Sequence, residues 1–329
     1  DCSNFHNFQK NINMKIVHRL IVVGCVGLFA ITSCVKDNEF ENKETLITRN
    51  VVELINADSI KSYVQMLQDM GTRYALADNR RKVATAILHK FQSFGFTSVV
   101  LDSFYLDTYS TWQYNVVADI CGRQYPDSVV IVGGHHDSIL REGNGDPFVE
   151  APGADDNASG VAVTLEVARI LKSCQYEPTH TIRFVTFAAE ELGLLGSLYL
   201  SYSYSTNGLK VKFMLNNDMV GYYNSDDSTS WVVNIIDYQN SIALRYKAED
   251  IFSNYTCLET VNDNKYQTRS DSYPFYVNGY KALFFITNGD DPNYHSLNDR
   301  VEACNFRFAR EVAKGNCALV LLNCFNVDN

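Results

Sequence analysis

The sequence predicts an α/β fold, a three-layer sandwich in which helices cover a largely parallel central sheet. Three observations support this prediction. The chain has 329 residues, of which 46% are hydrophobic, and this is enough apolar surface for a large core. Apolar runs of strand length alternate with longer segments of helical periodicity. Several apolar runs end in polar motifs, and sheets of this kind bind ligands beyond the carboxyl ends of their strands.

The first expected elements are one helix and three strands. Residues 79–94 have apolar side chains at helical spacing, and Gly95 is suited to end the helix. Residues 98–106, 114–120 and 128–132 are rich in β-branched, aromatic and other apolar residues, a composition that favours strands.

The rest of the chain alternates more regularly. A buried helix is predicted at residues 160–171, where most positions are apolar, then a strand at 181–188 and a helix at 192–202. The alternation favours helical crossovers between parallel strands. The remaining predicted elements are strands at 211–215, 231–236 and 282–286 and helices at 241–252 and 306–322.

The first part of the chain is predicted to be a targeting sequence. Residues 1–13 precede Met14, and we interpret them as an upstream or non-native extension. Residues 14–33 have a basic start and an apolar stretch of signal-peptide length. They lead into the segment ITSC at 31–34, which resembles the lipobox of bacterial lipoproteins and implies lipidation of Cys34. A buried core helix is the alternative interpretation.

This interpretation sets the expected domains and location. Residues 34–45 are the expected polar tether, and residues 46–329 are expected to form a single domain. The expected location is the cell envelope, on the periplasmic or outer-surface side of a Gram-negative outer membrane. The lipid at Cys34 is the only expected membrane contact, because no apolar run reaches the roughly 18 residues of a spanning helix.

Charge and cysteine content exclude two other classes. The net charge is −10 and there is no basic stripe, which argues against a nucleic-acid partner. The nine cysteines include no CxxC pair, which argues against a cysteine-rich zinc module. Cys304, Cys317 and Cys324 cluster near the end of the chain, so any disulfide is expected there, with free thiols as the alternative.

Two motifs lie between the strand predicted at 128–132 and the buried helix predicted at 160–171. In GGHHDS, residues 133–138, small residues let a side chain turn into a crevice, and Asp137 is placed to orient the imidazole of His135. A surface histidine is the alternative. In GADDNASG, residues 153–160, a helix cap would explain one of the adjacent carboxylates Asp155 and Asp156 but not both.

Three further motifs complete the set. Glu190 and Glu191 follow a predicted strand, and such a pair can divide metal binding and proton transfer. A solvated helix start is the alternative. Asp218 and His295 each follow another predicted strand, and either one alone is compatible with a cap, a turn or a surface side chain.

Taken together, the motifs are more specific than any one of them. Two histidines, three candidate carboxylate ligands and a spare glutamate form a set suited to two divalent ions. Imidazole and carboxylate without thiolate are compatible with zinc and do not exclude other divalent metals. Two-metal sites with a bound water hydrolyse amides and phosphates.

The same motifs resemble, in order, those of the co-catalytic di-zinc aminopeptidases, metallopeptidase family 28. The resemblance covers most of the chain after Cys34 and implies a zinc-exopeptidase fold of the phosphorylase/hydrolase-like type, two Zn²⁺ ions and peptide substrates. The matching segments are GGHHDS (133–138), GADDNASG (153–160), EELG (190–193), NDM (217–219) and YHS (294–296).

The resemblance implies five metal ligands. Asp155 would bridge the two ions, and the family's cis peptide bond would join it to Asp156. The other four ligands would be His135 and Asp218 on one ion and Glu191 and His295 on the other.

The resemblance also implies roles around the metals. Glu190 would be the general base, and Asp137 would orient the imidazole of His135 without contacting the metal. Tyr222 and Tyr223, just after Asp218, and Asp271, in a family-like segment, are placed in the substrate pocket. An apolar first residue is the expected preference.

Alternative functions stay open at this point. A glutaminyl-peptide cyclotransferase shares the fold and needs one zinc, and some homologues are non-catalytic binding proteins. A carboxypeptidase is a further alternative within the family. The complete ligand set and Glu190 favour the aminopeptidase, and the sequence leaves the oligomeric state open.

Overall fold

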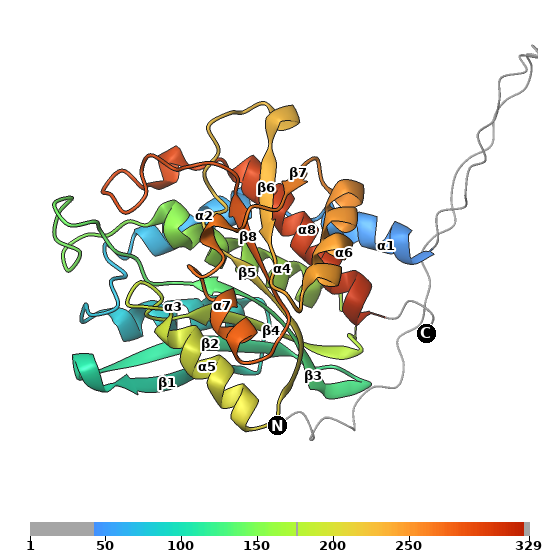
Figure 1. The fold of residues 1–329 in the computed structure, drawn as a ribbon, viewed down its shortest axis with the longest axis horizontal. Coiled ribbons are helices and arrows are strands. Elements are labelled where there is room, and N and C mark those ends of the chain that lie inside the picture. Colours follow the sequence, from blue (N-terminus) through green and yellow to red (C-terminus); the bar gives the residue numbers. More distant parts are fainter. Residues whose placement is uncertain (1–42, 176, 326–329) are drawn as a thin grey trace, which may run out of the picture.

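The computed structural model describes residues 43–175 and 177–325 (Figure 1). The extension, the signal peptide and Cys34 lie outside the described residues. Helix α1 (Lys43–Val52) crosses the predicted boundary at residue 46, so the end of the expected tether is helical. In the described part of the chain, none of the helices is both long and apolar enough to cross a bilayer.

A mixed sheet in the order β1-β2-β4-β3-β5-β8-β6-β7 forms the centre of the fold. β4, β3, β5 and β8 run parallel to one another in its middle, and antiparallel pairings join this block to β2 and to β6. The predicted largely parallel sheet is confirmed. The strands are β1 (Val99–Leu106), β2 (Thr111–Ile120), β3 (Tyr125–His135), β4 (His180–Phe187), β5 (Lys210–Asn217), β6 (Val232–Ile236), β7 (Glu259–Val261) and β8 (Ala282–Thr287).

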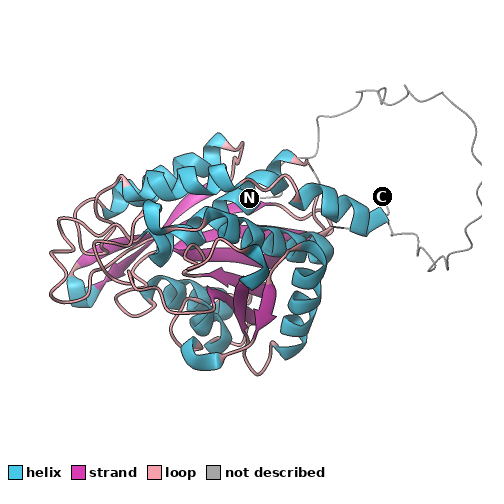
Figure 2. Ribbon diagram, turned by 90° about the horizontal axis from the view of Figure 1, so that it is seen from above, coloured by secondary structure: helices cyan, strands magenta, loops and turns pink. Residues whose placement is uncertain are grey.

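Helices cover both faces of the sheet, which gives the three predicted layers (Figure 2). One face carries α1 and most of the other helices, and the opposite face carries α5 and α7. The helices after α1 are α2 (Ala57–Gln68), α3 (Arg80–Ser93), α4 (Gly160–Ser173), α5 (Leu195–Thr206), α6 (Ile242–Tyr255), α7 (Ser272–Val277) and α8 (Phe306–Cys324).

The continuous apolar run in β3 reflects burial on both faces. Val130 and Val132 pack into the core beneath α4, whereas Val129 and Ile131 pack into the core beneath α5 and α7. Side chains of a strand alternate between faces, so a strand covered on both sides needs apolar residues at every position. This is why a short run of valine and isoleucine was sufficient to predict a central strand.

The central strands end together, and this placement creates the site. β3 continues past the predicted run to His135, which pairs with Phe187 at the end of β4. β5 likewise continues to Asn217 and pairs with β8. The helix predicted from residue 192 starts only at Leu195, because Leu194 has a left-handed φ of 61°.

Of the two alternatives for the cysteines near the end of the chain, free thiols are confirmed. Cys304, Cys317 and Cys324 are free thiols, so the bridge expected near the end of the chain does not form among them. Cys317 and Cys324 lie within the buried face of α8, where a thiol packs as a small apolar side chain.

Candidate metal centre and active site

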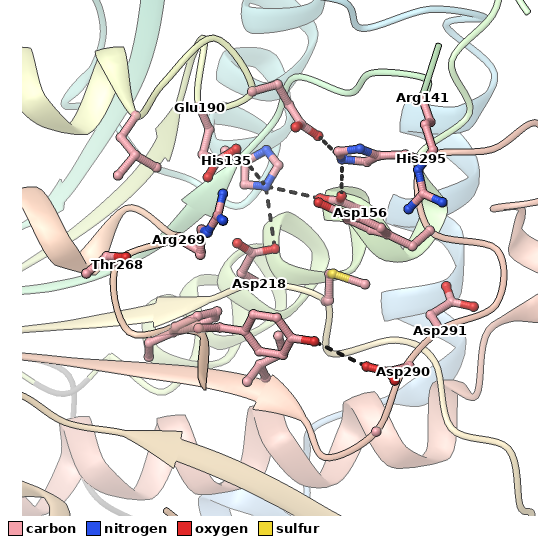
Figure 3. A pocket seen from close by; sticks show the side chains of 18 of the residues that line it. His135, Arg141, Asp156, Glu190, Asp218, Thr268, Arg269, Asp290, Asp291 and His295 are labelled. Atoms are coloured by element: carbon pink, nitrogen blue, oxygen red, sulfur yellow. Dashed lines mark hydrogen bonds and ion pairs between the residues drawn. The ribbon is translucent and has the colours of Figure 1, made fainter. Parts of the chain in front are cut away.

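The polar motifs converge beyond the carboxyl ends of the central strands (Figure 3). His135 ends β3, Asp218 follows β5, and His295 lies in the loop after β8. The turn after β4 and the turn before α4 contribute the remaining carboxylates. The side chains that meet are His135, Asp156, Glu190, Glu191, Asp218 and His295.

One group of donors surrounds His135. Its Nε2 lies 3.2 Å from Oδ1 of Asp156, 3.5 Å from Oδ1 of Asp218 and 3.9 Å from Oε2 of Glu190. One donor atom each from His135, Asp218 and Glu190 fit within 4.8 Å of one another. This spacing and this donor chemistry suit a divalent cation.

A second group surrounds His295. Its Nε2 lies 3.0 Å from Oδ2 of Asp156 and 3.1 Å from Oε1 of Glu191. Asp156 therefore directs one carboxylate oxygen at each histidine (Figure 3). A carboxylate in this position can be shared by two neighbouring ions.

The geometry corrects the expected position of Asp155. Its Oδ1 accepts hydrogen bonds from the backbone N–H groups of Gly221, at 2.6 Å, and Tyr222, at 3.0 Å. The carboxylate of Asp155 is thus engaged with the loop after β5. Asp156 occupies the position that was predicted for Asp155. The cis peptide bond is displaced by one residue too, because it joins Asp156 to Asn157.

A distant carboxylate fixes this turn. Asp299 accepts the backbone N–H of Asp155 at 2.7 Å and that of Asp156 at 3.0 Å. Its side chain is almost wholly buried, so these two bonds hold it in a single orientation. The direction of the Asp156 side chain is therefore set from the far end of the chain.

A buried arginine fixes the segment on the other side of the turn. Arg73 donates to the backbone oxygens of His136, Pro152 and Gly153 at 2.7–2.8 Å. Gly153 has a left-handed φ of 47°, and a Cβ there would meet a guanidinium nitrogen of Arg73 at 2.8 Å. Glycine is therefore required at residue 153 for this contact.

Asp137 contacts two parts of the site. Its Oδ1 lies 3.5 Å from Nδ1 of His135, where the sequence places it. It also accepts the backbone N–H groups of Glu190, at 3.1 Å, and Glu191, at 3.2 Å. Asp137 thus couples the end of β3 to the turn after β4, a contact that no sequence motif predicted.

Ser270 positions the side chain of Asp218, a candidate metal ligand. Its hydroxyl donates to Oδ2 of Asp218 at 2.5 Å and accepts from the side-chain amide of Asn216 at 2.6 Å. Oδ1 of Asp218 is left facing His135. His136 takes no part in the centre, because its Nδ1 lies 3.0 Å from the hydroxyl of Thr186.

Burial and mutual repulsion shift the proton affinities of the cluster. Burial raises the pKa of Glu190 well above its usual value and that of Glu191 to about 7. Burial alone would lower the pKa of His295, but hydrogen bonds to Asp156 and Glu191 outweigh it and raise the pKa to about 10. The cluster therefore carries more negative charge than it can hold without protons or another cation.

A cavity of about 980 Å³ opens beside the cluster. Met219, Tyr266, Phe284 and Ile286 give it an apolar wall, and Arg141 and Arg269 also line it. Figure 3 shows Arg141 beside His295, and Thr268 and Arg269 on the other side of the cluster.

The three residues expected in the substrate pocket do not line this cavity. The ring of Tyr223 stacks on Phe308, with 5.0 Å between centroids, and its hydroxyl donates to the backbone oxygen of Ser230. Tyr222 contacts Asp155 through its backbone. Asp271 is wholly buried, and burial raises its pKa to about 7. Neighbourhood in sequence was a poor guide here, because the chain turns away after Asp218.

Sequence comparison identifies relatives of the chain. The sequence pattern of peptidase family M28 matches residues 115–320. The chain is 31% identical over 270 residues to a probable zinc metalloprotease of Pyrenophora teres f. teres, covering 74% of this chain and 57% of that protein. It is 32% identical over 269 residues to a probable leucine aminopeptidase of Trichophyton verrucosum, covering 77% and 69%. The chain spans about half the length of several such relatives.

Structure comparison shows the same fold in solved proteins. The LapA aminopeptidase of Legionella pneumophila matches with a TM-score of 0.73 and 20% identity, over 93% of this chain and 80% of that one. The glutaminyl cyclase of Bacteroides thetaiotaomicron matches with a TM-score of 0.65 and 19% identity, over 81% and 98%. Identities this low establish the shared fold alone.

Proposed function

Because the chain belongs to peptidase family M28, we propose that it is a zinc aminopeptidase that removes the first residue of peptides. The observation that carries the proposal is the carboxylate of Asp156 between His135 and His295. It lies at the carboxyl ends of parallel strands, where this class of fold binds its ligands.

The donor set fits two zinc ions. His135 and Asp218 would hold one ion, Glu191 and His295 would hold the other, and Asp156 would be shared. Raised pKa values of Glu190 and Glu191 indicate excess negative charge that divalent cations would neutralise. When bound, the ions supply an activated water and polarise the peptide carbonyl.

Glu190 is the proposed general base. Its carboxylate is buried beside His135, and its backbone N–H is held by Asp137. In this position Glu190 accepts the proton of the attacking water and returns it to the leaving nitrogen. Burial raises the pKa of Glu190, which brings its proton affinity nearer to what both transfers need.

The apolar wall suggests which first residue is removed. Met219, Phe284 and Ile286 offer a surface for an aliphatic side chain, and the carboxylates of the cluster offer a partner for the free amino group. The proposed substrates are therefore peptides with leucine or a similar residue first. The names of relatives described as leucine aminopeptidases are consistent with this preference.

A product analysis tests the proposed activity. The zinc-loaded protein is expected to shorten a mixture of peptides stepwise from the amino end, fastest where leucine is first, as read by mass spectrometry. Part of the mixture begins with glutamine. Ammonia loss confined to those peptides would replace the aminopeptidase with a glutaminyl cyclase. Intact peptides with zinc bound would reject both activities.

Zinc affinity is expected to rise with pH. His295, with its pKa at about 10, and Glu191, with its pKa at about 7, hold protons at neutral pH that a metal must displace. Protonated donors prevail below these pKa values, so acid weakens binding, by about tenfold per pH unit for each proton released. Chelator competition between about pH 6 and about pH 8 measures this slope, and a flat profile would contradict it.

A further inference from the structure

Arg141 lies at the edge of a carboxylate-rich cavity, and its guanidinium has no anionic partner in the described part of the chain. Its side chain is exposed, lines the cavity and makes no ion pair among the described residues. The guanidinium lies over the ring of Tyr294, 5.9 Å from the centroid. That ring in turn stacks on the imidazole of His295 at 3.8 Å.

The backbone holds Arg141 at this place. Its N–H donates to the backbone oxygen of His295 at 2.8 Å, and the side-chain amide of Asn144 donates to the same oxygen at 3.2 Å. The N–H of Asn144 also donates to the backbone oxygen of Arg141 at 3.0 Å. The loop that carries Arg141 is therefore tied to the metal-ligand candidate His295.

Two other carboxylates that line the cavity, those of Asp290 and Asp291, accept hydrogen bonds from groups other than Arg141. Asp290 accepts from the hydroxyl of Tyr266 at 3.2 Å and from the ammonium of Lys265 at 3.4 Å. Asp291 accepts the backbone N–H of Asn293 at 2.8 Å. The guanidinium of Arg141 is thus left available to a ligand in the cavity.

The layout of the cavity indicates which part of a bound peptide would reach Arg141. In the proposed aminopeptidase, the apolar wall would take the first side chain, and the bond to be cleaved would lie over the cluster. Figure 3 shows Arg141 beside His295 at one end of the cluster, and Thr268 and Arg269 toward the other end. In the proposed binding mode, the residue after the cleaved bond lies on the Arg141 side of the cluster.

The geometry points to Arg141 as a specificity residue that binds a carboxylate on the residue after the cleaved bond. That carboxylate is the terminal one of a dipeptide or the side chain of an acidic second residue. Guanidinium and carboxylate form paired, charge-assisted hydrogen bonds, which suits this role. The inference rests on the proposed aminopeptidase activity and names a substrate class for it.

Capped and uncapped substrates test the assignment. The zinc-loaded protein is expected to cleave Leu-Gly with a kcat/KM about fivefold above that of Leu-Gly-amide, a typical effect of an exposed ion pair. Arg141→Gln should bring the ratio close to one. Arg269→Gln removes the same charge from the opposite side of the cavity and should leave the ratio unchanged. The preference should also shrink as salt is added.

Three outcomes decide the inference. If the preference for Leu-Gly over Leu-Gly-amide depends on Arg141, the ligand of Arg141 is the terminal carboxylate. If a preference for Leu-Glu-amide over Leu-Gln-amide depends on Arg141, the ligand is the side chain of an acidic second residue. If Arg141→Gln leaves both ratios unchanged, the inference is wrong while the aminopeptidase stands. Calorimetry with reduced-bond Leu-Gly and its amide gives the same comparison without turnover, so a failure of the proposed activity is recognised separately.

Discussion

Replacement of Glu190 by Gln is expected to lower kcat by about 10²- to 10⁴-fold while zinc stays bound. The glutamine amide has the shape of the carboxylate but cannot accept the proton of the attacking water. The backbone N–H of residue 190 would still donate to Asp137, so the turn should keep its form. Kinetics on a leucyl peptide, together with the zinc content of the purified variant, measure both parts of the expectation.

Glu142→Gln is the matched control. Glu142 is exposed on the loop that carries Arg141, and it makes no ion pair among the described residues. Its replacement should leave kcat near the wild-type value. Loss of zinc from Glu190→Gln would make Glu190 a ligand, an alternative that its grouping with His135 and Asp218 allows. Unchanged kcat in Glu190→Gln would remove its assignment as the base.

Replacement of Asp156 by Asn is expected to abolish high-affinity zinc binding and activity together. Asp156 has one oxygen near each histidine, so the change removes a charge from both ion sites. Loss of an outer partner of a ligand costs about 10- to 100-fold in affinity, and loss of a shared ligand should cost at least about 100-fold. Zinc titration of the metal-free variant, with its unfolding temperature as a check on folding, measures the effect.

Asp155→Asn separates the two neighbouring aspartates. The side-chain oxygen of asparagine can still accept the N–H groups of Gly221 and Tyr222, so this variant should fold and keep most of its zinc affinity. Equal loss of zinc in both variants would contradict the assignment of Asp156. Loss of zinc in Asp155→Asn alone would restore Asp155 as the bridge.

Hydrophobic patterns along the chain predicted most of the fold, because they reflect which faces of each helix and strand are buried. The valine and isoleucine run of β3 requires burial on both faces, and the apolar residues of α4 require a helix packed against that sheet. Helices α1 and α2 were missed, and α2 buries only one stripe of Ile60, Val64 and Leu67 among polar residues. The turn before α5 was missed because it depends on left-handed backbone at residues that are not glycine.

The sequence likewise predicted part of the candidate site but not all of it. The sequence predicted that His135, Glu190, Glu191, Asp218 and His295 would gather, because each follows a strand and parallel strands end at one edge. It could not choose between Asp155 and Asp156. That choice depends on hydrogen bonds that the backbone of the turn donates to Asp299, 144 residues from Asp155, and on a bond that the Gly221 N–H donates to Asp155.

By itself, the sequence determined the α/β architecture, the chemistry of the donor groups and the edge of the sheet where they lie. These features follow from hydrophobic periodicity and from residue type, which are read along the chain. Only the tertiary structure decided that Asp156 faces both histidines, that Tyr223 packs on Phe308 and that the loop of Arg141 is tied to His295. The direction of a side chain in an irregular turn is set by partners distant in sequence, and folding brings those partners together.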